Sequence, residues 1–278
     1  MKLGDYLSRI EYEGPVVPDL ACLTAIHRQH LLTIPYEDLD VQLRRPLDLD
    51  THSTFEKIVY RRRGGWCYEM NSLLCWALRE IGFEVTRIVG GVCRSSEGDE
   101  AMGNHLVLRV DLDAPMLADT GIGDGILDPI RFEIGRSVQG DRQFRIEELQ
   151  DGHWRFQNHE GLSPDSFDFL PESLADEDRL ARTCRNLQDN EDSIFRQNLI
   201  CMQPDGKGGT KMLIGRVLAL PGEEKRLLES ANEFCGVLED VFGLRDPDFL
   251  GLWPQVVARH EVVFGDGMPD ELSFDAVV

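Results

Sequence analysis

The chain has 278 residues, and its 50 Asp and Glu against 29 Lys and Arg give a formal net charge of −21 at pH 7. This balance argues against binding to nucleic acid or to an anionic membrane surface, because both need clustered Lys and Arg. Hydrophobic residues make up 42% of the chain, so a sizeable core is expected and wholesale disorder is not. A small anionic ligand stays possible, because helix termini and a few local cations can hold one.

The cysteines of the chain give an odd count and form no Cys-x-x-Cys motif. They stand at Cys22, Cys67, Cys75, Cys93, Cys184, Cys201 and Cys235. The start of the sequence has no apolar signal-peptide core, and no run approaches the length of a membrane helix. We therefore expect reduced thiols in a cytoplasmic protein that holds no metal.

Residues 1–83 are predicted to be helical. The pair Pro18-Asp19 has the form of a helix start. Residues 33–40 break the pattern with one proline and three acids, which indicates a loop. Residues 53–56, STFE, have the form of a capping box and are expected to start a further helix.

The most informative stretch is RGGWCYEMN at residues 63–71. From its tryptophan the apolar residues recur with helical spacing at Met70, Leu73, Leu74, Ala77 and Ile81. Cys67 should therefore lie in the first turn of a helix that ends near Gly82, where backbone N–H groups and the helix dipole favour a thiolate. The alternative interpretation is a buried structural cysteine, since free cysteine is among the most buried residue types.

From residue 84 the apolar period changes from helical to alternating, so residues 84–190 are predicted to be a β domain with a linker at its end. Strands are expected at residues 84–90, 105–112 and 116–119, with His105 at the start of the second and Asp119 at the end of the third. Residues 144–149 and 152–157 should form a hairpin. A glycine-rich turn, residues 120–125, follows Asp119.

The last part, residues 191–278, is predicted to be mixed. An apolar run at residues 193–203 and a strand at 210–220 flank a turn. A long amphipathic helix is expected after Pro221, and a short final helix is expected to begin at Pro254.

Cys67, His105 and Asp119 are the candidate catalytic residues. A hairpin-like pairing of the two strands would place His105 beside Asp119, and this strand pair could pack on the Cys67 helix. In such a set the histidine takes the thiol proton, and the aspartate fixes its tautomer and stabilises the imidazolium. The alternatives are a satisfied histidine at a strand start and an aspartate that caps a turn.

These motifs resemble the signatures of the arylamine N-acetyltransferase family. The resemblance rests on residues 63–71, on HLVL at 105–108 and on DTGIG at 119–123. It extends to IPYEDLD at residues 34–40 and to SIFRQNL at 193–199, so it covers nearly the whole chain in order.

The resemblance implies an α/β (α+β) chain in three parts with a cysteine-protease-like catalytic core. Its parts would be a helical bundle at 1–83, a β-barrel at 84–190 and an α/β lid at 191–278. It implies that Cys67 takes an acetyl group from acetyl-CoA as a thioester, with His105 as base and Asp119 as its partner. An arylamine, arylhydrazine or arylhydroxylamine would then attack the thioester in a ping-pong reaction. We expect the backbone N–H of Cys67 to contribute to an oxyanion hole.

Further roles follow from motif position. Tyr36 is expected to line the acceptor pocket, together with Asn104 and Ile122. Asn104 stands where the family usually has threonine, and Ile122 where it usually has an aromatic residue, so the acceptor preference is open. Gly121 and Gly123 are expected to contact CoA.

Two supporting interactions are also expected near the cysteine motif. Arg63 and Glu37 should form a structural ion pair that fixes the loop before Cys67. Glu69 and Asn71 should satisfy backbone groups near the helix start rather than touch substrate.

Three other functions remain open from the sequence. A macrolactam-forming amide synthase would use the same triad on a carrier-bound acyl chain. A hydrolase would pass the acyl group to water. A non-catalytic protein would bind aromatic amines or CoA in the same cleft.

Overall fold

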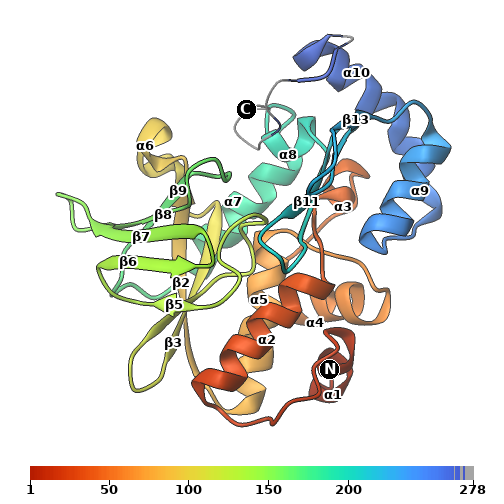
Figure 1. The fold of residues 1–278 in the computed structure, drawn as a ribbon. Helices are drawn as coiled ribbons and strands as arrows, with labels where there is room; N and C mark the ends of the chain where they lie inside the picture. Colours follow the sequence, from red (N-terminus) through yellow and green to blue (C-terminus); the bar gives the residue numbers. More distant parts are fainter. Residues whose placement is uncertain (266, 270–271, 273–278) are drawn as a thin grey trace.

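The computed structural model describes residues 1–265, 267–269 and 272, and its N-terminal part is helical, as predicted (Figure 1). Its helices are α1 (Leu3–Arg9), α2 (Leu20–Thr33), α3 (Leu39–Gln42), α4 (Thr51–Phe55), a π-helical turn (Glu56–Tyr60) and α5 (Cys67–Ile81). Asp19 caps α2, so the predicted helix start is confirmed. The predicted helix start at residues 53–56 is wrong. Helix α4 begins at Thr51, and the Asp50 carboxylate accepts from the backbone N–H groups of His52 and Ser53.

Helix α5 has the predicted bounds. It begins at Cys67 and ends at Gly82, whose φ of +107° lies in the left-handed region that favours glycine. Its apolar side packs into a core that includes Tyr6, Leu23 and Phe55. Burial of this face fixes α5 and thereby the position of Cys67.

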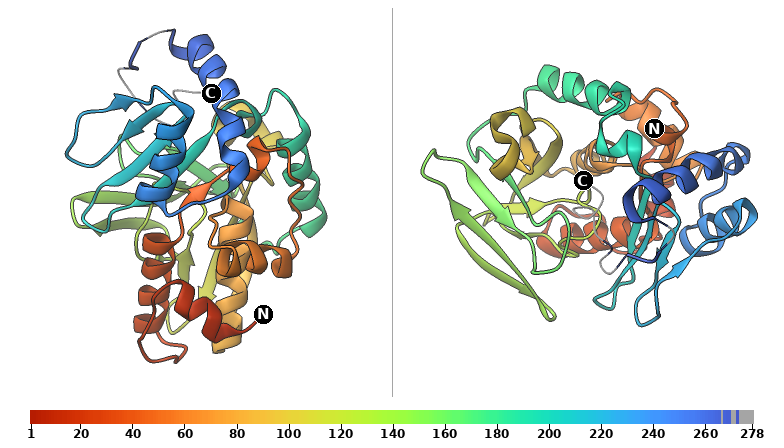
Figure 2. Two further views of the ribbon diagram at one scale, coloured as in Figure 1. Left: turned by 90° about the vertical axis from the view of Figure 1, so that its right-hand side faces the viewer. Right: turned by 90° about the horizontal axis from the view of Figure 1, so that it is seen from above.

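The middle of the chain forms an eight-stranded antiparallel sheet that curls into a nearly closed barrel, with strand order β5-β4-β3-β2-β9-β8-β7-β6 (Figures 1 and 2). Its strands are β2 (Glu84–Val92), β3 (His105–Asp111), β4 (Met116–Ala118), β5 (Ile130–Arg131), β6 (Gly135–Gln139), β7 (Arg142–Glu148), β8 (Trp154–Gln157) and β9 (Ser166–Phe169). A helical turn α6 (Arg94–Glu97) and a 3₁₀ turn (Gly98–Ala101) join β2 to β3.

One helix in this region was not expected from the sequence. The sequence pattern predicts sheet and loop up to residue 190, but α7 (Glu177–Asp189) begins after Asp176, whose carboxylate accepts from the N–H of Arg179. Only Leu180 and Cys184 of α7 are buried. Leu180, Cys184 and Leu187 recur with helical spacing in the sequence, but the many polar and charged residues between them favour a linker interpretation.

The last part contains a five-stranded antiparallel sheet with helices beside it (Figure 1). Its elements are α8 (Ile194–Gln197), β10 (Ile200–Pro204), β11 (Thr210–Ile214), β12 (Val217–Ala219), β13 (Arg226–Leu227), α9 (Ala231–Phe242), a 3₁₀ turn (Pro247–Leu252) and α10 (Trp253–Phe264). The single strand expected at residues 210–220 is two strands, because Gly215, with a φ of +56°, turns the chain.

The long helix begins later than the sequence indicated. Leu227, expected on the helix, pairs with Val217 in the sheet, and Ser230 caps α9 instead. The helix ends at Phe242, and Gly243 follows in the left-handed region, with a φ of +70°.

The five-stranded sheet also includes a strand from the first part of the chain. Strand β1 (Tyr36–Glu37) pairs with β10, with Tyr36 opposite Met202. The three domain boundaries stay a prediction. Residues 266, 270–271 and 273–278 of the predicted third part lie outside the described residues.

A buried ionic cluster lies beneath the loop that precedes α5. Lys57 Nζ lies 2.7 Å from a Glu69 carboxylate oxygen and 3.2 Å from one of Asp40. Arg63 lies 3.0 Å from Glu37, which confirms the expected ion pair, and 3.1 Å from Asp40. Glu69 also accepts from the N–H of Trp66 at 3.4 Å, so part of its expected backbone role is confirmed. The cluster ties the loop to the start of α5.

We expect Lys57→Met to lower the free energy of unfolding by about 3–5 kcal/mol, because it leaves buried carboxylates without their cation. Urea titration followed by circular dichroism measures the loss. The matched control is Arg44→Met, since the Arg44–Glu191 pair is exposed and should contribute little. Equal, small effects of the two substitutions would contradict a structural role for the cluster.

Candidate active site

Cys67 lies at the N-terminal end of α5 and is 3% exposed. Its thiol donates to the Asn104 carbonyl oxygen, with Sγ and O 3.5 Å apart. The loop after β4 passes so close that a Cβ on Gly121 would lie 2.7 Å from the Cys67 Cα. Only glycine fits at this contact.

His105 and Asp119 meet through the pairing of β3 and β4, as predicted. His105 begins β3, and Asp119 directly follows β4, with Leu108 opposite Ala118. His105 Nε2 and Asp119 Oδ2 are 2.7 Å apart, and both side chains are buried. Because Asp119 occupies Nε2, Nδ1 is the ring nitrogen left to exchange a proton with a reacting group.

Two further groups hold the Asp119 carboxylate. Asn71 Nδ2 donates to Oδ1 at 2.7 Å, and the Gly121 N–H donates to the same oxygen at 2.8 Å. Burial alone would raise the pKa of Asp119, but His105 and these donors hold it below its usual value. The carboxylate is therefore ionised at neutral pH.

Asn71 has a different role from the one expected. Its side chain does not serve the start of α5 but joins α5 to the barrel. The amide donates to the Leu106 carbonyl at 2.6 Å and to Asp119, and its oxygen accepts from the Thr120 N–H at 2.8 Å. It thus fixes the cysteine helix against the strands that carry His105 and Asp119.

His27 is a supporting residue that sequence analysis missed. This fully buried side chain of α2 accepts from the Asp119 backbone N–H at Nε2, 3.1 Å away. Its Nδ1 donates to the Leu127 carbonyl at 2.9 Å. Burial lowers the pKa of His27, which keeps the ring neutral and suited to both bonds. No sequence motif marked this residue, because its partners lie far along the chain.

The electrostatics of Cys67 differ from the expectation for a helix start. Burial raises the pKa of the thiol well above its ordinary value, and nearby Cys184 and Asp119 add to the rise. The Tyr68 backbone N–H acts in the opposite direction but does not outweigh burial. Ionisation of this buried thiol would require a proton acceptor within the site, and His105 lines the same cavity.

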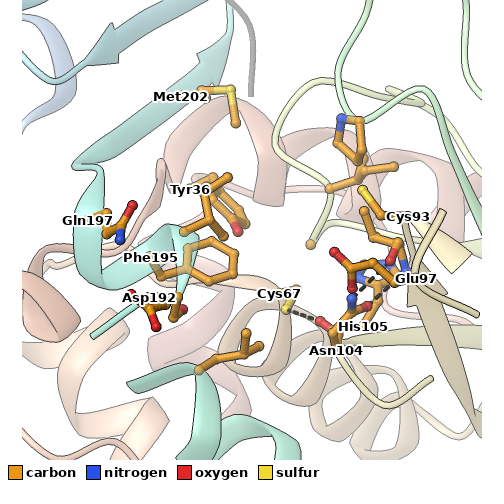
Figure 3. A pocket seen from close by; sticks show the side chains of 17 residues that line it. Tyr36, Cys67, Cys93, Glu97, Asn104, His105, Asp192, Phe195, Gln197 and Met202 are labelled. Atoms are coloured by element: carbon orange, nitrogen blue, oxygen red, sulfur yellow. Dashed lines mark hydrogen bonds between the residues drawn. The ribbon is translucent and has the colours of Figure 1, made fainter. Parts of the chain in front are cut away.

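Cys67 and His105 open into a cavity of about 240 Å³ (Figure 3). Tyr36, Asn104 and Ile122 line it, as does Gly121. Gly123 is not among the lining residues, and a Cβ there would meet the Met202 side chain at 2.5 Å. CoA contacts of Gly121 and Gly123 stay a prediction.

The remaining lining residues come largely from segments without an assigned role in the sequence. They are Val92, Cys93, Glu97, Pro164, Leu187, Asp192, Ser193, Ile194, Phe195, Gln197 and Met202. The motif at residues 193–199 marked part of this wall, but nothing in it indicated which side chains face the cavity.

Two properties of the described part of the chain bear on other functions. Within it, no group of three or more His, Cys, Asp or Glu side chains could hold a metal ion. None of its helices combines the length and the apolar character needed to cross a membrane.

Comparisons with known proteins agree with the motifs. A family model described as N-acetyltransferase matches residues 19–246. The arylamine N-acetyltransferase of Mycolicibacterium smegmatis is 42% identical over 161 residues, which cover 55% of this chain and 58% of that relative. The pineal gland isozyme of Gallus gallus is 32% identical over 233 residues, covering 74% and 79% of the two chains. Sequence alignments thus span less than two thirds of the first two curated relatives, 58% and 45% of their lengths.

Solved structures extend the likeness over the whole fold. The arylamine N-acetyltransferase of Mycobacterium marinum in complex with CoA matches with a TM-score of 0.80 and 29% identity, covering 93% of this chain and 98% of that one. The enzyme of Salmonella typhimurium matches with a TM-score of 0.81 and 27% identity, covering 92% and 97%. From the family model and these relatives together, the chain belongs to the arylamine N-acetyltransferase family.

Proposed function

We propose that this protein transfers an acetyl group from acetyl-CoA to the nitrogen of an arylamine, arylhydrazine or arylhydroxylamine. The observation that carries the proposal is the meeting of Cys67 and His105 at one cavity, with Asp119 bonded behind the histidine. The relatives named above are arylamine N-acetyltransferases, and one was solved with CoA. All seven cysteines are free, which supports a cytoplasmic location.

The first half-reaction forms an acetyl thioester. The Cys67 proton passes to His105 Nδ1 while Asp119 stabilises the resulting imidazolium. The thiolate attacks the acetyl carbonyl, the backbone N–H of Cys67 stabilises the oxyanion, and the CoA thiolate leaves with the proton from His105. Because one thioester replaces another, this step is nearly isoenergetic.

The second half-reaction transfers the acetyl group to nitrogen. The neutral amine attacks the thioester carbonyl, the N–C bond forms, the C–S bond breaks, and the amine proton returns through His105 to Cys67. Anilines and hydrazines are neutral near pH 7, whereas alkylamines are mostly protonated and cannot attack. The acceptor class follows from this requirement.

The alternatives have less support. An amide synthase would take its acyl group from a carrier-bound chain, whereas the relatives named above are arylamine N-acetyltransferases. A hydrolase would pass the acetyl group to water without an amine. A binding protein without catalysis would have no use for a histidine–aspartate pair at the same cavity as a buried thiol.

Intact-protein mass spectrometry with acetyl-CoA and no acceptor tests the proposal. We expect one acetyl adduct on the wild type and none on Cys67→Ala, and an added aniline should discharge the adduct. Discharge at the same rate without the aniline would favour hydrolysis. The absence of any adduct would contradict acetyl transfer.

Asp119→Asn should slow acetylation by about 10²–10⁴-fold, because the imidazolium loses its anionic partner. Single-turnover release of CoA measures the rate, and circular dichroism checks the fold. Asp113→Asn is the matched control, since Asp113 is exposed. Similar rates for the two variants would remove Asp119 from the mechanism.

His105→Gln should change how Cys67 alkylation depends on pH. In the wild type, iodoacetamide should label Cys67 at a lower pH than in the variant, because His105 accepts the thiol proton. In the variant, labelling should begin only above the range of an ordinary thiol, because burial raises the Cys67 pKa. Cys67→Ala gives the background from the other cysteines. Superimposable profiles would show that His105 does not activate the thiol.

A further inference from the structure

We propose that the cavity selects arylamines and arylhydrazines that carry a second, cationic group, and that Glu97 and Asp192 make this selection. The inference rests on the proposed acetyl transfer and concerns the acceptor alone. Both carboxylates line the cavity that contains Cys67. In the view of Figure 3 they stand on opposite sides of Cys67, Glu97 on the side of His105 and Asp192 on the side of Phe195.

The charged side chains that line this cavity are acidic. No Lys or Arg is among its lining residues, and His105 is bonded to Asp119. In the described part of the chain, neither Glu97 nor Asp192 forms an ion pair of its side chain. The two carboxylates are therefore free to interact with a bound ligand.

Other acidic residues in the same two segments do form ion pairs, unlike Glu97 and Asp192. Glu191, next to Asp192, pairs with Arg44 at 3.0 Å. Asp99, two residues after Glu97, pairs with Arg94 at 2.6 Å. The nearby arginines are thus bonded to acids that do not line the cavity.

An independent observation points to a polar ligand at the same wall. Ser193 lines the cavity and is only 7% exposed, yet its hydroxyl has no hydrogen-bond partner among the described residues. A buried hydroxyl without a partner is unfavourable, so a group that donates to it or accepts from it would be stabilised. An amidine or ammonium group can donate to Ser193 Oγ while it interacts with the Asp192 carboxylate.

The apolar surfaces of the cavity suit the rest of such an acceptor. Tyr36 and Phe195 line the cavity with aromatic rings, and Ile122 adds an aliphatic face. An aryl ring can pack among them with its attacking nitrogen toward Cys67. The attacking nitrogen stays neutral near pH 7, whereas an amidine, guanidine or alkylammonium substituent stays charged. One molecule can therefore carry both a neutral nucleophile for the acetyl group and a cation for the two carboxylates.

The test is the discharge of the acetyl enzyme by three acceptors of similar shape. Wild type is acetylated with acetyl-CoA, freed of donor, and mixed with 4-aminobenzamidine, 4-aminobenzamide or 4-aminobenzoate. Mass spectrometry follows the loss of the adduct from Cys67. The rate with the neutral amide is the reference within each protein, which cancels differences in overall activity.

We expect Glu97→Gln and Asp192→Asn each to lower the amidine-to-amide rate ratio and raise the benzoate-to-amide ratio by roughly three- to ten-fold. Comparison of each variant with wild type cancels the different intrinsic reactivities of the three amines. High salt should weaken the wild-type discrimination, because both carboxylates are exposed to solvent. A change in only one variant assigns the selection to that carboxylate.

Glu191→Gln is the matched control, since Glu191 carries the same charge next to Asp192 but does not line the cavity. Ratios that stay at wild-type values in both Glu97→Gln and Asp192→Asn would overturn the inference. So would equal shifts in the Glu191→Gln control. Failure of the proposed acetyl transfer would look different, because no adduct would form before any acceptor is added.

Discussion

The candidate active site depends on one side chain, the amide of Asn71, which joins two independently built parts of the fold. Helix α5 is fixed by its apolar face, and β3 and β4 are fixed by their pairing. Neither element alone determines the distance from Cys67 to His105. The Asn71 amide bonds to Leu106, Thr120 and Asp119 at once, so it sets the helix against the strands. A buried amide with all its partners is rigid, and rigidity is what a proton relay needs.

Much of this arrangement could be predicted from the sequence, because local signals determine it. Glycines before Cys67 and at Gly82 mark the ends of α5, and alternation marks β3 with His105 at its start. The two strands that carry His105 and Asp119 are neighbours in the chain, so their pairing follows from short-range pattern. The family motifs further imply a chain in three parts, whose boundaries stay a prediction.

The features that could not be predicted from the sequence depend on contacts between segments that are far apart in the chain. His27 bonds to a backbone group 119 − 27 = 92 residues away, and no local pattern marks that pairing. Leu227 fits a helix by pattern although it pairs in a sheet. The effect of burial on the Cys67 thiol also required the fold, since the helix dipole alone suggests the opposite direction.

Strand β1 has a consequence for the order in which the site assembles. Tyr36 pairs with Met202, a separation of 202 − 36 = 166 residues, and both line the cavity. His105 and Asp119, by contrast, are 14 residues apart. Closing a longer loop costs more chain entropy, so contacts of high sequence separation form later in folding. The proton relay should therefore exist before its pocket does, and on the ribosome the acceptor site cannot be completed until β10 has emerged.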